Sequence, residues 1–285
     1  MTGATVLLKA ENLQKTGSFK ARGGLNAIGR LSAEERARGV ITVSAGNHGI
    51  ALSYAGSMLV APVTVVMPET AVKSKMAAIE AYGGRTVRVD GGHLMESMEE
   101  IRGREGQVFI HPFDNPDVIA GQGTVGLELL EDCPDVEVVV VPVGGGGLIS
   151  GVATAIKLQQ PHIAVIGVEP EGSTAVSQSL AAGKPVWLKQ FQTVADGLNA
   201  PWGGPNSLSI VQGRVDRVLT VTDDEILLAL RIILERTKLL VEPAGAAAVA
   251  ALLTGRVHEA EGRTAIAVLS GGNVDLSRLS DILSE

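Results

Sequence analysis

The chain has 285 residues, of which 45% are hydrophobic but only 3% aromatic, and its formal net charge is −7. Such a length fits one large or two modest α/β domains, and an aliphatic core suits parallel sheets covered by helices. The excess of acidic over basic residues argues against nucleic acid or an anionic membrane as a partner. The single cysteine excludes an intrachain disulfide. With no signal peptide and no apolar run of membrane-spanning length, we expect a soluble, cytoplasmic protein.

The first predicted elements are a strand at 6–8, a turn containing Gly17, and a helix that begins near Ser18 with Lys20 in its first turn. Because a helix N-terminus carries partial positive charge, it disfavours an ammonium and favours the neutral amine. A neutral lysine amine can form a Schiff base with a carbonyl compound. A lysine that extends into solvent is the alternative that this stretch alone leaves open.

A strand at 40–43 leads into the turn Ser44-Ala45-Gly46-Asn47-His48-Gly49 and a helix at 50–59. A small, polar turn at a helix start exposes backbone N–H groups that can bind an anion. Asn47 adds a side-chain donor. His48 is a candidate general base, although a capping or packing role is the more common one for a single histidine at a helix start.

The same alternation of strands and helices continues, which predicts βαβ units and a mostly parallel sheet. Ser32 and Glu35 resemble a capping box, and Asp223 is expected to cap a long helix. The stretch 111–117, rich in Pro, Asp and Asn, is the candidate domain boundary. Further strands are expected at 63–67, 86–89, 108–110, 136–141, 164–168, 215–221 and 264–269. Further helices are expected at 32–38, 72–82, 94–104, 119–130, 149–158, 174–182, 225–238 and 246–253.

Four consecutive glycines, Gly144 to Gly147, follow the apolar strand at 136–141 and precede a helix. Backbone N–H groups without side chains in the way favour a phosphate ligand. The turn lacks the Lys-Ser/Thr end of a P-loop, and its spacing does not fit the fingerprint of dinucleotide-binding proteins. A purely structural glycine turn is the alternative.

Five segments, in order along the chain, resemble motifs of the serine/threonine dehydratase group of pyridoxal-phosphate (PLP) enzymes, which have the tryptophan synthase β-like fold. They are Lys15–Gly23, Ser44–His48, Gly144–Gly147, Val241–Gly245 and Ser270–Asn273. The resemblance implies an α/β, two-domain PLP fold type II with mostly parallel twisted sheets covered by helices on both faces. It places a large PLP-binding domain at 1–38 and 118–285 and a small domain at 39–117, with the cofactor in the cleft between them, and it implies a homodimer.

The resemblance also assigns roles to residues. Lys20 corresponds to the lysine that holds the cofactor as an imine and then takes the substrate's Cα proton. Asn47 corresponds to the partner of the cofactor's 3-oxygen, and Ser270 to the partner of its pyridine nitrogen. The implied cofactor-binding residues are Phe19, Lys20, Asn47, Gly144, Gly145, Gly146, Gly147, Leu148, Gly197, Glu242 and Ser270. The implied substrate-binding residues are Ser44, Ala45, Gly46, Asn47 and His48.

The implied reaction is β-elimination from L-threonine or L-serine, which gives a 2-oxo acid and ammonia. Ser270 supports it, because a hydroxyl can donate to a neutral pyridine nitrogen but cannot keep that nitrogen protonated, which favours elimination over transamination. The alternatives are a serine racemase or hydroxyaspartate dehydratase of the same family, a catalytically impaired cofactor-binding protein with a shortened N-terminus, and a nucleotide-binding Rossmann protein.

Two positions depart from the family's patterns. Ala45 stands where racemases of the family have a serine that transfers a proton, and a methyl group cannot do so. Glu169 matches the first ligand of the family's divalent metal site, but Ser173, Thr174 and Ala175 supply no later carboxylate. Hard cations need several oxygen ligands, so we expect no metal, and a solvated residue at a strand end is the alternative interpretation of Glu169.

Overall fold

The computed structural model describes residues 2–284, and the chain divides into two compact units. Unit 1 consists of Met1–Phe19 and Gln122–Glu285, and unit 2 consists of Lys20–Gly121. Each unit has its own parallel β-sheet between helices, so the alternation of strands and helices in the sequence produces two separate sheets.

Unit 1 contains a five-stranded sheet with the order β1-β9-β6-β7-β8, in which every pair of neighbours is parallel. Its strands are β1 (Thr5–Ala10), β6 (Val138–Pro142), β7 (Ala164–Pro170), β8 (Arg217–Val221) and β9 (Thr264–Leu269). Its helices are α7 (Gly147–Gln159), α8 (Ala175–Ala182), α9 (Pro205–Arg214), α10 (Asp223–Thr237), α11 (Pro243–Leu253) and α12 (Leu276–Ser284), together with most of α6 (Pro116–Asp132).

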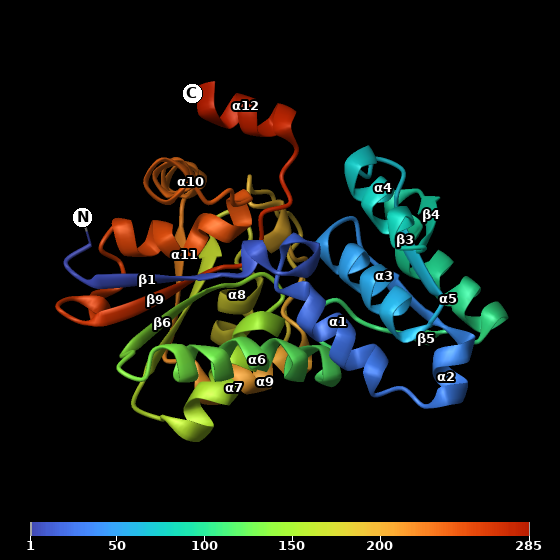
Figure 1. The fold of residues 1–285 in the computed structure, drawn as a ribbon, viewed down its shortest axis with the longest axis horizontal. Coiled ribbons are helices and arrows are strands. Elements are labelled where there is room, and N and C mark those ends of the chain that lie inside the picture. The colour runs from blue at the N-terminus through green and yellow to red at the C-terminus, as the bar shows by residue number, and fades with distance from the viewer. Residues whose placement is uncertain (1, 285) are drawn as a thin grey trace. The chain divides into compact units, whose positions relative to one another are not determined.

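Helices cover both faces of this sheet. In the central strand β6, Val138 and Val140 pack with buried residues of α10 and α11. Val139 and Val141 point to the opposite face, where they pack with residues of α6, α7 and α9. Figure 1 shows α10 and α11 on one side of β1, β9 and β6, and α6, α7 and α9 on the other. A strand buried on both faces is continuously apolar, which explains the run of four valines.

Unit 2 contains a four-stranded parallel sheet with the order β4-β3-β2-β5. Met67 of β3 belongs to a core cluster with residues of α1, α3 and α4, whereas Val66 packs on the other face with Met98 of α5. The strands are β2 (Val40–Val43), β3 (Val63–Pro68), β4 (Arg85–Val89) and β5 (Val108–Phe109). The helices are α1 (Lys20–Gly29), α2 (Ala33–Arg38), α3 (Asn47–Leu59), α4 (Lys73–Ala81) and α5 (Leu94–Glu105).

The predicted strands are all present, with ends that differ by at most two residues. The capping box of Ser32 and Glu35 at the start of α2 is confirmed. Two helices, α9 and α12, were not predicted, and α1 begins at Lys20 rather than near Ser18.

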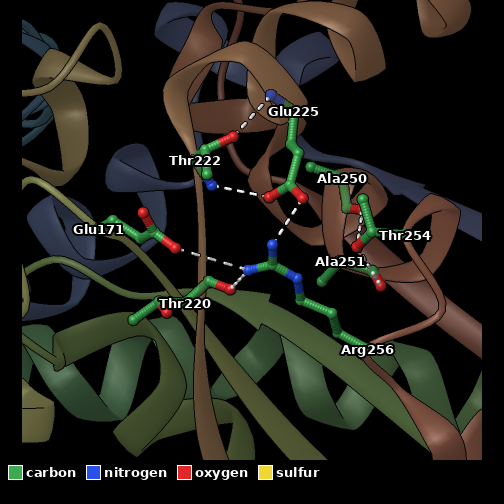
Figure 2. A network of polar contacts seen from close by, with 8 residues as sticks. All are labelled: Glu171, Thr220, Thr222, Glu225, Ala250, Ala251, Thr254 and Arg256. Atoms are coloured by element: carbon green, nitrogen blue, oxygen red, sulfur yellow. Dashed lines mark hydrogen bonds and ion pairs between the residues drawn. The ribbon is translucent and has the colours of Figure 1, made fainter.

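The expected cap of α10 was wrong, because Thr222 is the N-cap and forms a capping box with Glu225 (Figure 2). The Thr222 hydroxyl accepts from the Glu225 N–H at 3.2 Å, and the Glu225 carboxylate accepts from the Thr222 N–H at 2.8 Å. Arg256 donates to the same carboxylate at 2.6 Å and also to the carbonyl of Thr220. Asp223 instead accepts from the Val194 N–H at 3.0 Å, so its carboxylate holds a neighbouring loop.

We expect Thr222→Ala to lower the free energy of unfolding by about 1 kcal/mol, because it removes the acceptor for the Glu225 N–H at the start of α10. Thr222→Ser keeps a hydroxyl and is expected to stay within about 0.5 kcal/mol of the parent chain. Urea denaturation followed by circular dichroism measures both. Equal losses in the two variants would contradict the role of the hydroxyl.

Candidate active site

Lys20 is the first residue of α1 and follows directly on a segment that is fixed to the end of β9. The Phe19 N–H donates to the Ser270 carbonyl at 3.1 Å, and Ser18 forms a β-bridge with Gly271. The side chain of Phe19 packs against the unit 1 core. Backbone hydrogen bonding to the residues after β9 therefore fixes the chain immediately before the lysine.

The amine of Lys20 donates a hydrogen bond to the carbonyl oxygen of Pro112 at 2.6 Å. Burial lowers the pKa of this amine from 10.5 to about 8. Burial, together with the charge of Lys20, also lowers the pKa of His48 well below 6.5 and that of His111 to about 4, so both imidazoles are neutral at pH 7. The predicted direction of the Lys20 shift is confirmed, but its cause is burial rather than the helix terminus.

The turn from Ser44 to His48 joins β2 to α3. The Ser44 hydroxyl oxygen accepts from the N–H groups of Gly46 (3.2 Å) and Gly49 (3.1 Å), so this side chain shapes the turn. Ala45 is exposed, and α3 begins at Asn47. The first N–H groups of a helix have no acceptor within the helix, and such a start favours a carboxylate or another anion.

The side chain of His48 is buried, and its Nε2 lies 3.3 Å from the carbonyl oxygen of Ile110. The imidazole therefore packs inside unit 2. What His48 can offer to a ligand is its backbone N–H, which lies in the first turn of α3.

The Gly144–Gly147 turn lies between β6 and α7, and its last three glycines are buried. A Cβ added to Gly146, whose φ is +94°, would lie 3.0 Å from the Cβ of Ser207, and one added to Gly144 would lie 3.1 Å from the Cα of Leu198. At these two positions the turn is closely packed, and a side chain would force its neighbours to shift. The N–H groups at the start of α7 have no intrahelical acceptor, which fits a phosphate.

Three further predicted residues, Ser270, Glu242 and Gly197, lie together in unit 1. The Glu242 N–H donates to the carbonyl of Gly271 at 3.0 Å. A Cβ on Gly197 would lie 3.6 Å from Oε1 of Glu242 and 3.0 Å from the Cβ of Ala244. The Ser270 hydroxyl lies 3.5 Å from the Ala244 carbonyl, which is the outer limit of a hydrogen bond, so this contact holds the hydroxyl only weakly.

Three neighbours of the glycine turn were not predicted. Leu198 and Ser207 are the residues that a Cβ on Gly144 or Gly146 would meet, and Val176 of α8 lies 3.6 Å from the Cβ position of Gly146. These residues pack against the turn, and packing leaves no chemical signal in the sequence. In the sequence, the glycines of the turn themselves, Gly144 to Gly147, were the hint that other chain segments approach this turn closely.

Glu169 is fully buried, so its interpretation as a solvated residue at a strand end was wrong. Its carboxylate accepts hydrogen bonds from the N–H groups of Val176 (2.8 Å) and Ser177 (2.9 Å) and from the Ser177 hydroxyl (2.5 Å). Burial raises the pKa of Glu169 to about 7, against the opposing effect of these hydrogen bonds. Within residues 2–284, no group of three or more His, Cys, Asp or Glu side chains is arranged to hold a metal ion.

Residues 1–271 match the sequence profile of the family described as "Pyridoxal-phosphate dependent enzyme". The chain belongs to this family. It is 44% identical to an L-threonine ammonia-lyase of Geobacter sulfurreducens over 284 residues, which are 99% of this chain and 70% of the relative.

Solved structures with similar sequences have closely similar folds. A processed form of threonine deaminase isoform 2 from Solanum lycopersicum has a TM-score of 0.94 at 36% identity, covering 99% of this chain and 83% of that one. A serine racemase of Dictyostelium discoideum has a TM-score of 0.91 at 40% identity, covering 96% of this chain and 89% of that one. The predicted α/β PLP fold type II is confirmed.

The cofactor of this family is pyridoxal 5′-phosphate, and the residues present fit it. A closely packed glycine turn at the start of α7 suits the phosphate, and the low pKa of Lys20 suits a lysine that must bind a carbonyl carbon as a neutral amine. Among the described residues, we find no helix whose length and hydropathy would allow it to cross a lipid bilayer.

The rate at which the cofactor-free protein captures pyridoxal phosphate is expected to rise about fivefold from pH 7 to pH 8 and to level off near pH 9. Only the neutral amine reacts, and an amine with a pKa of about 8 is mostly deprotonated above that pH. Stopped-flow absorbance of the lysine-bound cofactor measures the rate. A rate that still rises tenfold per pH unit above pH 9 would indicate an amine with an ordinary pKa.

Gly146→Ala is expected to weaken pyridoxal phosphate binding by about tenfold or more, because the added Cβ meets Ser207 and the φ of +94° disfavours alanine. The control is Gly183→Ala, where φ is +66° but no atom lies within 4 Å of the Cβ position. Titration of the cofactor-free protein gives both affinities. Equal affinities in the two variants would contradict a role of the packed glycine turn in cofactor binding.

Proposed function

We propose that this chain is a PLP-dependent ammonia-lyase that converts L-threonine, L-serine or both to a 2-oxo acid and ammonia. The observation that carries the proposal is the 44% identity to an L-threonine ammonia-lyase across 99% of this chain. The low pKa of the Lys20 amine supports it, because the reaction needs a base that is partly deprotonated near neutral pH.

The bound cofactor supplies an electron sink that allows the Cα proton and the Cβ hydroxyl of the substrate to leave. In the proposed site, Lys20 Nζ holds the cofactor and, when released, accepts the Cα proton. The N–H groups of the turn from Ser44 to His48 bind the substrate carboxylate, which fits the start of α3.

We assign the remaining predicted residues to the cofactor. The N–H groups of Gly144–Gly147 and Leu148 would bind its phosphate, because they lie at the start of α7. Ser270 would donate to the pyridine nitrogen, with Gly197 and Glu242 near the ring, and Asn47 would bind the 3-oxygen. The close packing of Gly197, Glu242 and Ser270 within unit 1 supports a shared role for these three.

A serine racemase is the second candidate, since a serine racemase is among the similar structures at 40% identity. The exposed Ala45 argues against it, because its methyl group cannot transfer a proton. A hydroxyaspartate dehydratase uses the same chemistry on a more acidic substrate, and it is distinguished by the assay below.

L-Threonine, L-serine and L-threo-3-hydroxyaspartate should be supplied in parallel to the cofactor-loaded protein, with Lys20→Ala as the blank. We expect 2-oxo acid release from L-threonine or L-serine and its loss in the blank by a factor of at least about 1,000, because both the cofactor link and the base are removed. Release from hydroxyaspartate alone would identify the related dehydratase. Chiral chromatography that finds D-serine as the main product would identify a racemase, and no product from any substrate while the cofactor is visibly bound would indicate a cofactor-binding protein.

We also propose that the protein acts in the cytoplasm as a homodimer and that residues 1–38 and 118–285 form its large cofactor-binding domain, with 39–117 as the small one. The resemblance to the serine/threonine dehydratase group supports these assignments. Light scattering of the purified protein distinguishes a dimer, with twice the mass of the chain, from a monomer.

A further inference from the structure

His111 shapes the turn that follows β5. Its Nδ1 accepts hydrogen bonds from the N–H groups of Phe113 (3.3 Å) and Asp114 (3.0 Å). An imidazole nitrogen accepts only when it carries no proton, so this arrangement requires a neutral ring with its proton on Nε2. The ring also contacts Phe109 and Phe113 edge to face, with centroids 5.8 and 4.5 Å apart, and these contacts fix its orientation.

The same turn carries the hydrogen-bond partner of Lys20. In the sequence, Pro112 follows the acceptor His111 and precedes Phe113 and Asp114, which donate to it. The carbonyl oxygen of Pro112 is 2.6 Å from Lys20 Nζ. The ring of Pro112 fixes its φ near −65°. The orientation of its carbonyl is then determined by the rest of the turn. Closing the turn through His111 therefore sets the direction of the Pro112 carbonyl.

An amine held in this way keeps its reactive electron pair. A neutral amine has two N–H groups and one lone pair, and donation of one N–H to a carbonyl leaves the lone pair available. The contact also adds no charge beside the lysine, because the pKa of His111 is about 4. The turn can therefore restrict the rotation of the amine. A carboxylate in the same place would favour the protonated amine, whereas a carbonyl carries no net charge.

We infer that His111 is a positioning residue: its Nδ1 holds the turn whose Pro112 carbonyl orients the Lys20 amine for bond formation with the cofactor. This inference rests on the proposed function, in which Lys20 is the residue that holds the cofactor. Rates of bond formation depend strongly on the placement of the attacking atom, and small displacements reduce them by one to two orders of magnitude.

The chain contains a second turn with the same arrangement, which provides a matched control. Oδ1 of Asn115 accepts from the N–H groups of Asp117 (2.9 Å) and Val118 (3.0 Å). An asparagine can therefore replace His111 as the acceptor for two N–H groups at positions two and three residues further on. Asn115 caps α6 and is not a predicted site residue.

The experiment measures how fast cofactor-free variants capture pyridoxal phosphate, by the absorbance of the lysine-bound cofactor, and records the melting temperature of each. We expect His111→Ala to capture it at least about tenfold more slowly. His111→Asn is expected to stay within about threefold of the parent chain, because it restores the acceptor. Asn115→Ala is expected to lower the melting temperature about as much as His111→Ala but to capture the cofactor at the parent rate.

Two results would overturn the inference: a folded His111→Ala variant that captures the cofactor at the parent rate, or a folded His111→Asn variant that is as slow as His111→Ala. The variant Lys20→Ala shows whether the inference alone fails or the proposed function fails as well. If Lys20→Ala still forms the lysine-bound cofactor, another lysine holds it, and both the proposed role of Lys20 and the inference fail. If Lys20→Ala forms none while His111→Ala is normal, only the inference fails.

Discussion

Removal from water disfavours the charged form of an amine, and burial lowers the pKa of the Lys20 amine to about 8, so that a fraction of it is neutral near pH 7. The charge of a partly protonated lysine inside the protein must then be tolerated by its surroundings. Here the neighbouring side chains His48 and His111 are held neutral, and a backbone carbonyl supplies the hydrogen bond. The start of α3 and the turn after β5 each place a neutral imidazole near the amine.

Much of the fold could be predicted because its strands are short and β-branched and are followed by glycine or polar turns. The valines of β6 and the glycine turn after them are the clearest case. The same rules missed α9, which contains Asn206, Ser207 and Gly213, residues with weak helix propensity. Packing against α7 stabilises this helix, and such tertiary contacts are not visible in a local pattern.

The sequence predicts the candidate site by residue type, but it does not predict the environment of each residue. The lowered pKa of Lys20 was predicted, yet its cause is burial, which depends on residues far away in the sequence. Glu169 was expected at the surface and is buried, because the N–H groups at the start of α8 accommodate its carboxylate. The contact between Lys20 and Pro112 uses a backbone carbonyl, and any residue carries one, so no sequence signal marks it.

The pairing of β1 with β9 has a consequence for how the protein is made. Thr5 pairs with Thr264, and the Phe19 N–H binds the carbonyl of Ser270, so the segment that fixes the start of α1 needs partners from the other end of the chain. Contacts between residues so distant in sequence form late, and during synthesis they cannot form before the ribosome has released the second partner. The segment before Lys20 therefore gains its final hydrogen bond only after synthesis has passed Ser270. A nascent chain that stalls earlier would carry Lys20 and the turn Gly144–Gly147 without the hydrogen bond that fixes the chain just before Lys20.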